Sequence, residues 1–164
     1  MIRKKSTIIL MLVAVVTFIS LNSCNPATKY EKEEAAAIEG YLASNSNLNF
    51  IIQPSGLYYL ELEAGTGRQA ITSDTAAVIY TGSLIDGSVF DTNVGSDLLI
   101  RPVNEGLLIP GFDEGITLMK EGGKALLLIP SKLAYGTQGF YGIPGYSPLL
   151  FNIELVQVKP GPGK

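Results

Sequence analysis

A long alternating run that ends in a tight turn constrains the fold of this chain most. Residues 75–84 read TAAVIYTGSL, and an extended backbone places Ala76, Val78 and Tyr80 on one face of that run. Asp86 and Gly87 follow shortly after, a pair typical of a two-residue hairpin turn. The segment therefore predicts a β-hairpin, and with it an antiparallel sheet.

The remaining patterns indicate one β-rich domain with a single internal helix. Strand-forming runs cover residues 56–63, 98–103, 124–130 and 149–158. Residues 110–120 (PGFDEGITLMK) have a helical pattern, with Asp113 and Glu114 in the first turn and a Gly-Gly pair after the end. We predict an α+β fold in which the antiparallel sheet folds over one short helix.

Composition excludes several classes of function. The chain has no histidine, so His-based zinc sites and Ser-His-Asp triads are absent, and we expect neither a metal nor a cofactor. A formal net charge of −3 argues against nucleic acid as a partner, because such proteins present basic surfaces. The Gly-rich fingerprints of nucleotide-binding loops are also missing from the sequence.

The first 23 residues have the pattern of an export signal. Arg3, Lys4 and Lys5 precede an apolar run at residues 8–19, and small residues follow before Cys24. The run is shorter than the roughly 20 apolar residues that span a bilayer as a permanent anchor. A secretory signal that is cleaved nearby is the simplest interpretation.

Cys24, the only cysteine of the chain, allows a more specific interpretation. The stretch LNSC at 21–24 resembles the bacterial lipoprotein box, with Leu at −3 and a small residue before the cysteine. The resemblance implies that residues 1–23 are a lipoprotein signal peptide and that the Cys24 thiol is lipidated. Several acyl chains would then hold the protein on a membrane. A lone cysteine forms no internal disulfide, so a reactive thiol is the alternative.

A helical segment separates the cysteine from the sheet. After a polar linker at 25–28, residues 30–44 are rich in Glu, Lys and Ala, with acidic residues near the expected helix start. Ile38, Tyr41 and Leu42 are spaced to form one stripe that can pack on the domain. We predict an anchored linker and spacer helix at 24–50, the domain at 51–158 and a disordered tail at 159–164.

Four separated stretches of the domain resemble one known family. They are YTGSLIDGSVFD at 80–91, LLIPGFDEGITLMKEGGKALLLIP at 107–130, AYG at 134–136 and LLFNIELVQV at 149–158. In this order they are similar to the FK506-binding-protein (FKBP) type of peptidyl-prolyl cis-trans isomerase. That family has a twisted antiparallel sheet wrapped around a short helix, which agrees with the fold predicted from the residues.

The resemblance also implies a set of site residues, carried over position by position. Those that match catalytic positions of the family are Tyr80, Phe90, Asp91, Ile109 and Tyr135. Those that match substrate-binding positions are Leu99 (or its neighbour Leu98), Leu108, Phe112, Ile143 and Phe151. Phe112 stands where many members have Trp, and Phe140 stands at or near a rim position that is often His. The sequence leaves open whether Asp91 orients Tyr80 or faces the substrate carbonyl.

Two functions remain open at this point. The first is an isomerase that accelerates X-Pro rotation in exported proteins, with proline-containing polypeptides as substrates and macrolides as inhibitors. The second is a non-catalytic chaperone or envelope assembly subunit that binds proline-containing segments. In either case the lipoprotein resemblance implies a bacterial cell envelope, with the protein anchored to a membrane at its periplasmic or surface face.

Overall fold

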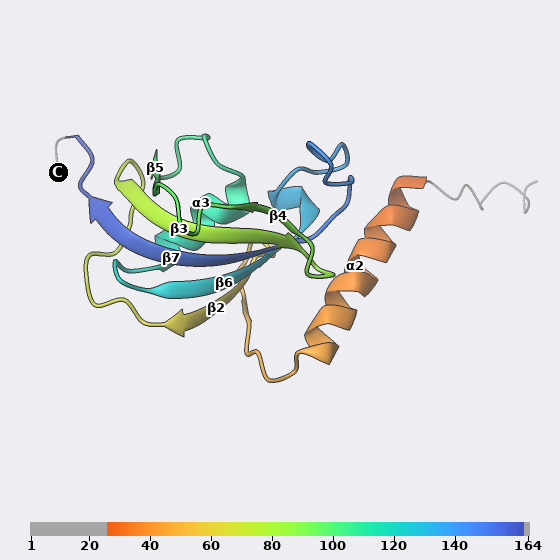
Figure 1. The fold of residues 1–164 in the computed structure, drawn as a ribbon. Coiled ribbons are helices and arrows are strands. Elements are labelled where there is room, and N and C mark those ends of the chain that lie inside the picture. The colour runs from red at the N-terminus through yellow and green to blue at the C-terminus, as the bar shows by residue number, and fades with distance from the viewer. Residues whose placement is uncertain (1–25, 163–164) are drawn as a thin grey trace, which may run out of the picture. The chain divides into compact units, whose positions relative to one another are not determined.

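The computed structural model describes residues 26–162 of the chain, and the side chains from Ala27 onward. Its centre is a seven-stranded, wholly antiparallel sheet with the order β1-β2-β6-β7-β3-β4, in which β5 also pairs with β3 (Figure 1). The strands are β1 (Ile51–Ile52), β2 (Tyr58–Glu63), β3 (Thr75–Leu84), β4 (Val89–Thr92), β5 (Leu99–Pro102), β6 (Lys124–Ile129) and β7 (Leu149–Lys159).

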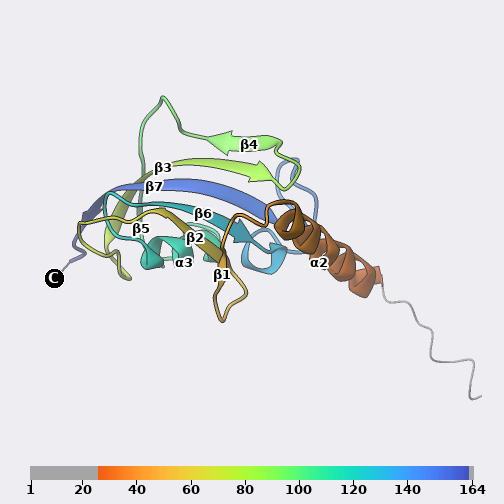
Figure 2. The same cartoon turned by 90° about the horizontal axis from the view of Figure 1, so that it is seen from below.

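One helix, α3 (Pro110–Leu118), lies under the arch of this sheet (Figure 2). Proline occupies the start of the helix, where its missing N–H costs no hydrogen bond. A Cβ atom on Gly115 would lie 2.3 Å from a methyl carbon of Leu127, so the glycine lets the helix approach β6 closely. The predicted fold class, an antiparallel sheet around one short helix, is confirmed.

Both faces of the two central strands are covered where β6 ends and β7 begins. On β6, Leu127 and Ile129 face the main core with α3, whereas Leu128 belongs to a second cluster on the opposite face. On β7, Phe151 belongs to the main core and Leu150 to the second cluster. Burial on both faces at this end of the sheet explains why the residues after Lys124, ALLLI, form a continuous apolar run instead of an alternating one.

Helix α2 (Pro26–Ser44) supplies the cover of the second face. Ile38 is buried there against Leu128 and Leu150, and Tyr41 and Leu42 pack on the same cluster. The compact unit that contains the sheet begins at Glu33, within this helix. The helix begins four residues earlier than the predicted start at Tyr30, and no acidic residue lies in its first turn. The first position of a helix tolerates proline well, so Pro26 can begin the helix, which the sequence interpretation overlooked.

The C-terminal segment is more ordered than predicted. Lys159 still belongs to β7 and pairs with Thr75. The Gly161 N–H donates to Oδ1 of the buried Asp74 at 3.0 Å. Asp74 also accepts two hydrogen bonds from Arg68 through Oδ2 and one through Oδ1. The prediction of a disordered tail from residue 159 is therefore wrong for 159–161, because a buried carboxylate holds that segment.

The predicted signal peptide and Cys24 lie outside the described residues. Within residues 26–162, no helix is long and apolar enough to cross a bilayer.

Candidate active site

The β3–β4 hairpin carries the first site residues, and its turn differs from the predicted one. The Leu84 N–H donates to the Ser88 carbonyl and the Gly87 N–H to the Leu84 carbonyl, at 2.9 and 3.0 Å. The connection therefore has three residues, 85–87, rather than two. Gly87 takes the left-handed conformation, with φ of 91°, that such a turn requires at its last position.

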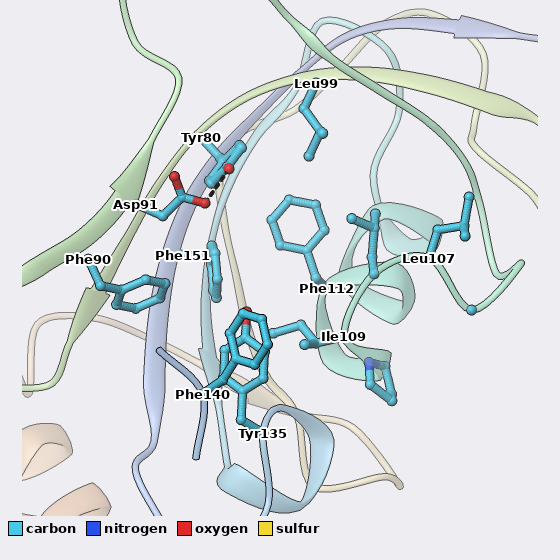
Figure 3. A pocket seen from close by; sticks show the side chains of 13 residues that line it. Tyr80, Phe90, Asp91, Leu99, Leu107, Ile109, Phe112, Tyr135, Phe140 and Phe151 are labelled. Carbon is cyan, nitrogen blue, oxygen red and sulfur yellow. Dashed lines mark hydrogen bonds between the residues drawn. The ribbon is translucent and has the colours of Figure 1, made fainter. Parts of the chain in front are cut away.

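A β-bulge on β4 then places two consecutive side chains at one site. Gly82 is opposite Asp91 and Ser83 is opposite Val89, so Phe90 is an extra residue in the ladder. In a regular strand Phe90 and Asp91 would point to opposite faces. Both instead lie beside the same cavity (Figure 3).

Gly82, on β3, leaves the space that two aromatic rings occupy. A Cβ atom there would lie 2.7 Å from Cζ of Phe90 and 2.8 Å from Cε1 of Phe151. Ordinary carbon contacts are about 3.5–4.0 Å, so no larger residue fits without moving a ring. Sequence reasoning did not assign a role to this glycine.

The aromatic rings form a connected cluster with edge-to-face geometry. The Phe112 and Phe151 centroids are 5.1 Å apart at 84°, and Phe90 and Phe151 are 5.6 Å apart at 80°. Tyr80 contacts the cluster through Phe112, at 5.7 Å and 84°. Phe112 is 3% exposed and Phe151 4%, so these two rings make a dry floor.

These side chains converge on one cavity of about 460 Å³ (Figure 3). Of the predicted site residues, nine line it: Tyr80, Phe90, Asp91, Leu99, Leu108, Ile109, Phe112, Tyr135 and Phe151. Ile143 does not, because its side chain is buried in the main core instead of lying over the opening. The lining also includes Phe140, which was expected near the rim, and three residues that the sequence interpretation missed: Gly106, Leu107 and Pro110.

The carboxylate of Asp91 is bound to Tyr80. The Tyr80 hydroxyl donates to Oδ2 of Asp91 at 2.5 Å. Burial, followed by this hydrogen bond and the charge of Asp91, raises the pKa of Tyr80 well above its ordinary value. Burial and the same charge also raise the pKa of Tyr135. Both phenols therefore stay protonated at neutral pH.

Asn93, which follows β4, fixes the backbone beneath Tyr80. Its Oδ1 accepts the Tyr80 N–H at 2.7 Å, and its Nδ2 donates to the carbonyls of Val78 and Asp97 at 3.0 and 3.1 Å. The buried amide thus replaces ladder bonds where β3 changes partner from β5 to β4. An Asn after a strand is an ordinary turn signal, and nothing in the sequence distinguishes it as a brace.

Two hydrogen-bond donors on the cavity wall are available to a ligand. They are the backbone N–H of Ile109, just before α3, and the hydroxyl of Tyr135. Neither donates a hydrogen bond to any acceptor within residues 26–162. The Tyr135 ring is held by Phe140, which stacks on it with centroids 4.9 Å apart and planes at 13°. The site is therefore an apolar hollow with donors at its edge.

Comparisons with known proteins agree with this geometry. A profile of the family described as FKBP-type peptidyl-prolyl cis-trans isomerase matches residues 66–156, more than half of the chain, and the chain belongs to that family. The protein named FKBP-type peptidyl-prolyl cis-trans isomerase FkpA of Escherichia coli K12 is 47% identical over 110 residues, which are 66% of this chain and 40% of that protein. Outer membrane protein MIP of Legionella longbeachae is 38% identical over 134 residues, which are 80% of this chain and 57% of that protein.

A solved structure gives the same result for the fold. The crystal structure of FkpA from Escherichia coli has a TM-score of 0.72 and 34% sequence identity, and the match covers 99% of this chain and 75% of that one. The chain spans less than two thirds of the length of the two curated relatives named above.

Proposed function

We propose that this protein is a peptidyl-prolyl cis-trans isomerase that accelerates X-Pro rotation in exported polypeptides. One observation carries the proposal. Tyr80, Phe90, Phe112 and Phe151, from four different elements, converge on a cavity with free donors at its edge. Membership of the isomerase family supports it further.

The reaction requires no nucleophile, because no covalent bond is broken. Rotation about an X-Pro bond is slow because twisting removes amide resonance, which contributes to a barrier of about 18–20 kcal/mol. The planar amide has a larger dipole than the twisted one. A dry aromatic floor therefore disfavours the planar ground state relative to the transition state. Each factor of ten in rate requires about 1.4 kcal/mol of that preference.

The wall residues take complementary roles in this proposal. Phe112 and Phe151 exclude water from the proline ring, and Phe90 closes the side of the cavity next to the bulge. The Ile109 N–H and the Tyr135 hydroxyl bind substrate carbonyls and hold one side of the bond while the other turns. Asp91 orients Tyr80, the role that the 2.5 Å hydrogen bond supports over a direct contact with the substrate.

The test is cis-trans exchange of a Phe-Pro tetrapeptide measured with the full-length chain. We expect exchange to be faster than the spontaneous rate and to be inhibited by a macrolide of the FK506 type that competes for the same cavity. Phe112→Ala should lower the rate by enlarging and wetting the floor. Peptide binding without any acceleration would support the alternative, a chaperone or assembly subunit that only binds proline-containing segments.

The same proposal includes a location in the bacterial cell envelope, through lipid on Cys24. The LNSC motif supports the lipid anchor, and the name of the Legionella longbeachae relative, outer membrane protein MIP, is consistent with an envelope setting. Acyl chains supply about 0.8 kcal/mol for each buried methylene, and two or more give stable attachment.

Palmitate labelling in a bacterial host tests the anchor. Cys24→Ala should abolish labelling and move the protein from the detergent phase to the aqueous phase. Ser23→Gly retains a small residue before the cysteine and should label as the wild type does. Equal detergent partitioning of Cys24→Ala and wild type would refute the lipid anchor.

A further inference from the structure

Helix α2 contacts the segment that carries Tyr135 through one carboxylate. Oε1 of Glu34 accepts the Ser131 N–H at 2.5 Å, and Oε2 accepts the Ser131 hydroxyl at 2.7 Å. Ser131 is 5% exposed and begins the short 3₁₀ helix Ser131–Leu133. Pro130, at the N-cap of that helix, makes no side-chain capping hydrogen bond. Glu34 is therefore the acceptor for both buried donors of Ser131.

The remaining polar group of Ser131 holds the backbone around Tyr135. Its carbonyl accepts the N–H of Ala134 at 2.9 Å and the N–H of Gly136 at 2.8 Å. These two residues flank Tyr135 directly. The Gly136 carbonyl in turn accepts the Tyr146 N–H at 2.9 Å. A continuous set of hydrogen bonds thus runs from Glu34 through Ser131 to both neighbours of the cavity-lining tyrosine.

The position of the Glu34 carboxylate is itself fixed by packing. Ile38 lies four residues later on the same helical face and is 6% exposed against Leu128 and Leu150. Leu150 immediately precedes Phe151, a ring of the cavity floor. The helix is therefore seated on the reverse side of the strands whose front side forms the site.

We propose that Glu34 is a positioning residue. By binding Ser131 it fixes the segment 131–136, which is the cavity rim, and so orients the Tyr135 hydroxyl towards the substrate. Its effect on catalysis rests on the proposed isomerase function, whereas its effect on the rim does not. The helix before the sheet is then part of the working site and not only a spacer between the domain and the N-terminal segment.

The experiment combines hydrogen exchange with kinetics on the full-length chain. In Glu34→Ala, we expect the amides of Ser131, Ala134 and Gly136 to exchange hydrogen about tenfold faster, because the two hydrogen bonds that hold Ser131 are lost and the turn that depends on Ser131 opens more often. We expect kcat/KM for a Phe-Pro peptide to fall about three- to tenfold. Glu34→Gln keeps an acceptor for the N–H and a polar partner for the hydroxyl, and should restore both values to within about twofold of the wild type.

Two further variants separate positioning from a general loss of structure. Glu39→Ala removes an exposed carboxylate of the same helix and should change neither the amide hydrogen exchange nor kcat/KM for the peptide. In a Tyr135→Phe background, Glu34→Ala should have almost no additional effect on kcat/KM, because the hydroxyl that it positions is already absent.

The outcomes are distinct. Unchanged amide hydrogen exchange at Ala134 and Gly136 in Glu34→Ala would overturn the proposal, as would an equal loss of kcat/KM with and without the Tyr135 hydroxyl. A wild-type chain that does not accelerate cis-trans exchange of the peptide would instead refute the proposed function. The amide exchange of Glu34→Ala would still decide whether Glu34 fixes the rim.

Discussion

Replacing Gly82 by alanine tests the geometry of the aromatic site with a single methyl group. The added Cβ would lie 2.7 and 2.8 Å from Cζ and Cε2 of Phe90 and 2.8 Å from Cε1 of Phe151. Because carbon contacts are ordinarily about 3.5–4.0 Å, both rings must move away from the added methyl group, by about 1 Å each. Phe151 is buried among the core residues, whereas Phe90 is only half-buried on the bulge, so we expect the larger displacement at Phe90.

The expected cost in stability is small compared with the cost in rate. Overpacking costs about 1–3 kcal/mol, and replacing a strand glycine by alanine recovers about 0.5–1 kcal/mol of backbone entropy. The free energy of unfolding should therefore fall by only about 1–2 kcal/mol. Displacing a wall of the site by about 1 Å can reduce the rate by up to about a hundredfold, so we expect kcat/KM to fall at least tenfold.

The assay pairs urea unfolding with peptide exchange on the same preparations. Gly40→Ala, on helix α2, is the matched control, because a Cβ there has no neighbour within 4 Å. It should leave the rate unchanged. In a Phe90→Ala background only the 2.8 Å contact with Phe151 remains, so Gly82→Ala should have a smaller effect. Full activity of Gly82→Ala in the wild-type background would show that the positions of the Phe90 and Phe151 rings are irrelevant to the reaction.

Three further predictions concern ionisable and hydroxyl groups. Tyr80→Phe removes the hydrogen bond to the exposed Asp91; we expect at most about 1 kcal/mol less stability and a three- to tenfold lower kcat/KM, and an unchanged rate would exclude a role for the hydroxyl. Burial alone would raise the pKa of Asp74, but hydrogen bonds from Gly161 and Arg68 outweigh burial and hold the pKa below its ordinary value. The carboxylate therefore stabilises the fold above about pH 4, and this contribution disappears as the pH falls. In chemical denaturation, the free energy of unfolding should decrease less steeply towards acid pH for Asp74→Asn than for wild type. Burial raises the pKa of Asp113, and its Oδ1 has no hydrogen-bond partner among the described residues. As the pH rises from about 4 towards neutrality, wild type should therefore lose stability relative to Asp113→Asn. A difference in the free energy of unfolding that stays constant with pH would contradict the assignment.

The fold was largely predictable because its patterns are local. The alternation at 75–84, the helix punctuation around 110–120 and the apolar run at 149–158 each correspond to an element of the structure. The covered second face was predictable in part. The spacing of Ile38, Tyr41 and Leu42 predicts a helical stripe that packs on the domain, and the structure adds that this stripe lies against Leu128 and Leu150.

The residues that line the cavity were predictable where the resemblance supplied positions, and less so where packing decides. Nine of the ten carried-over residues line the cavity. Ile143 does not, because the turn that contains it directs the side chain into the core. Gly82 and Asn93 escaped notice for a different reason. Gly82 acts through an absent side chain, and Asn93 acts through hydrogen bonds from its side-chain amide to backbone groups 13–15 residues away. Neither leaves a pattern in a single sequence.

Peptide exchange by the full-length chain, followed from about pH 6 to pH 9, is the most direct test of the central claim. If a dry aromatic cavity lowers the rotational barrier without acid or base chemistry, exchange should exceed the spontaneous rate in proportion to protein concentration. The acceleration should also be constant with pH, because the raised pKa values of Tyr80 and Tyr135 keep both phenols protonated. Cis-trans exchange of the peptide at the spontaneous rate, or an acceleration that changes with pH near neutrality, would contradict the account.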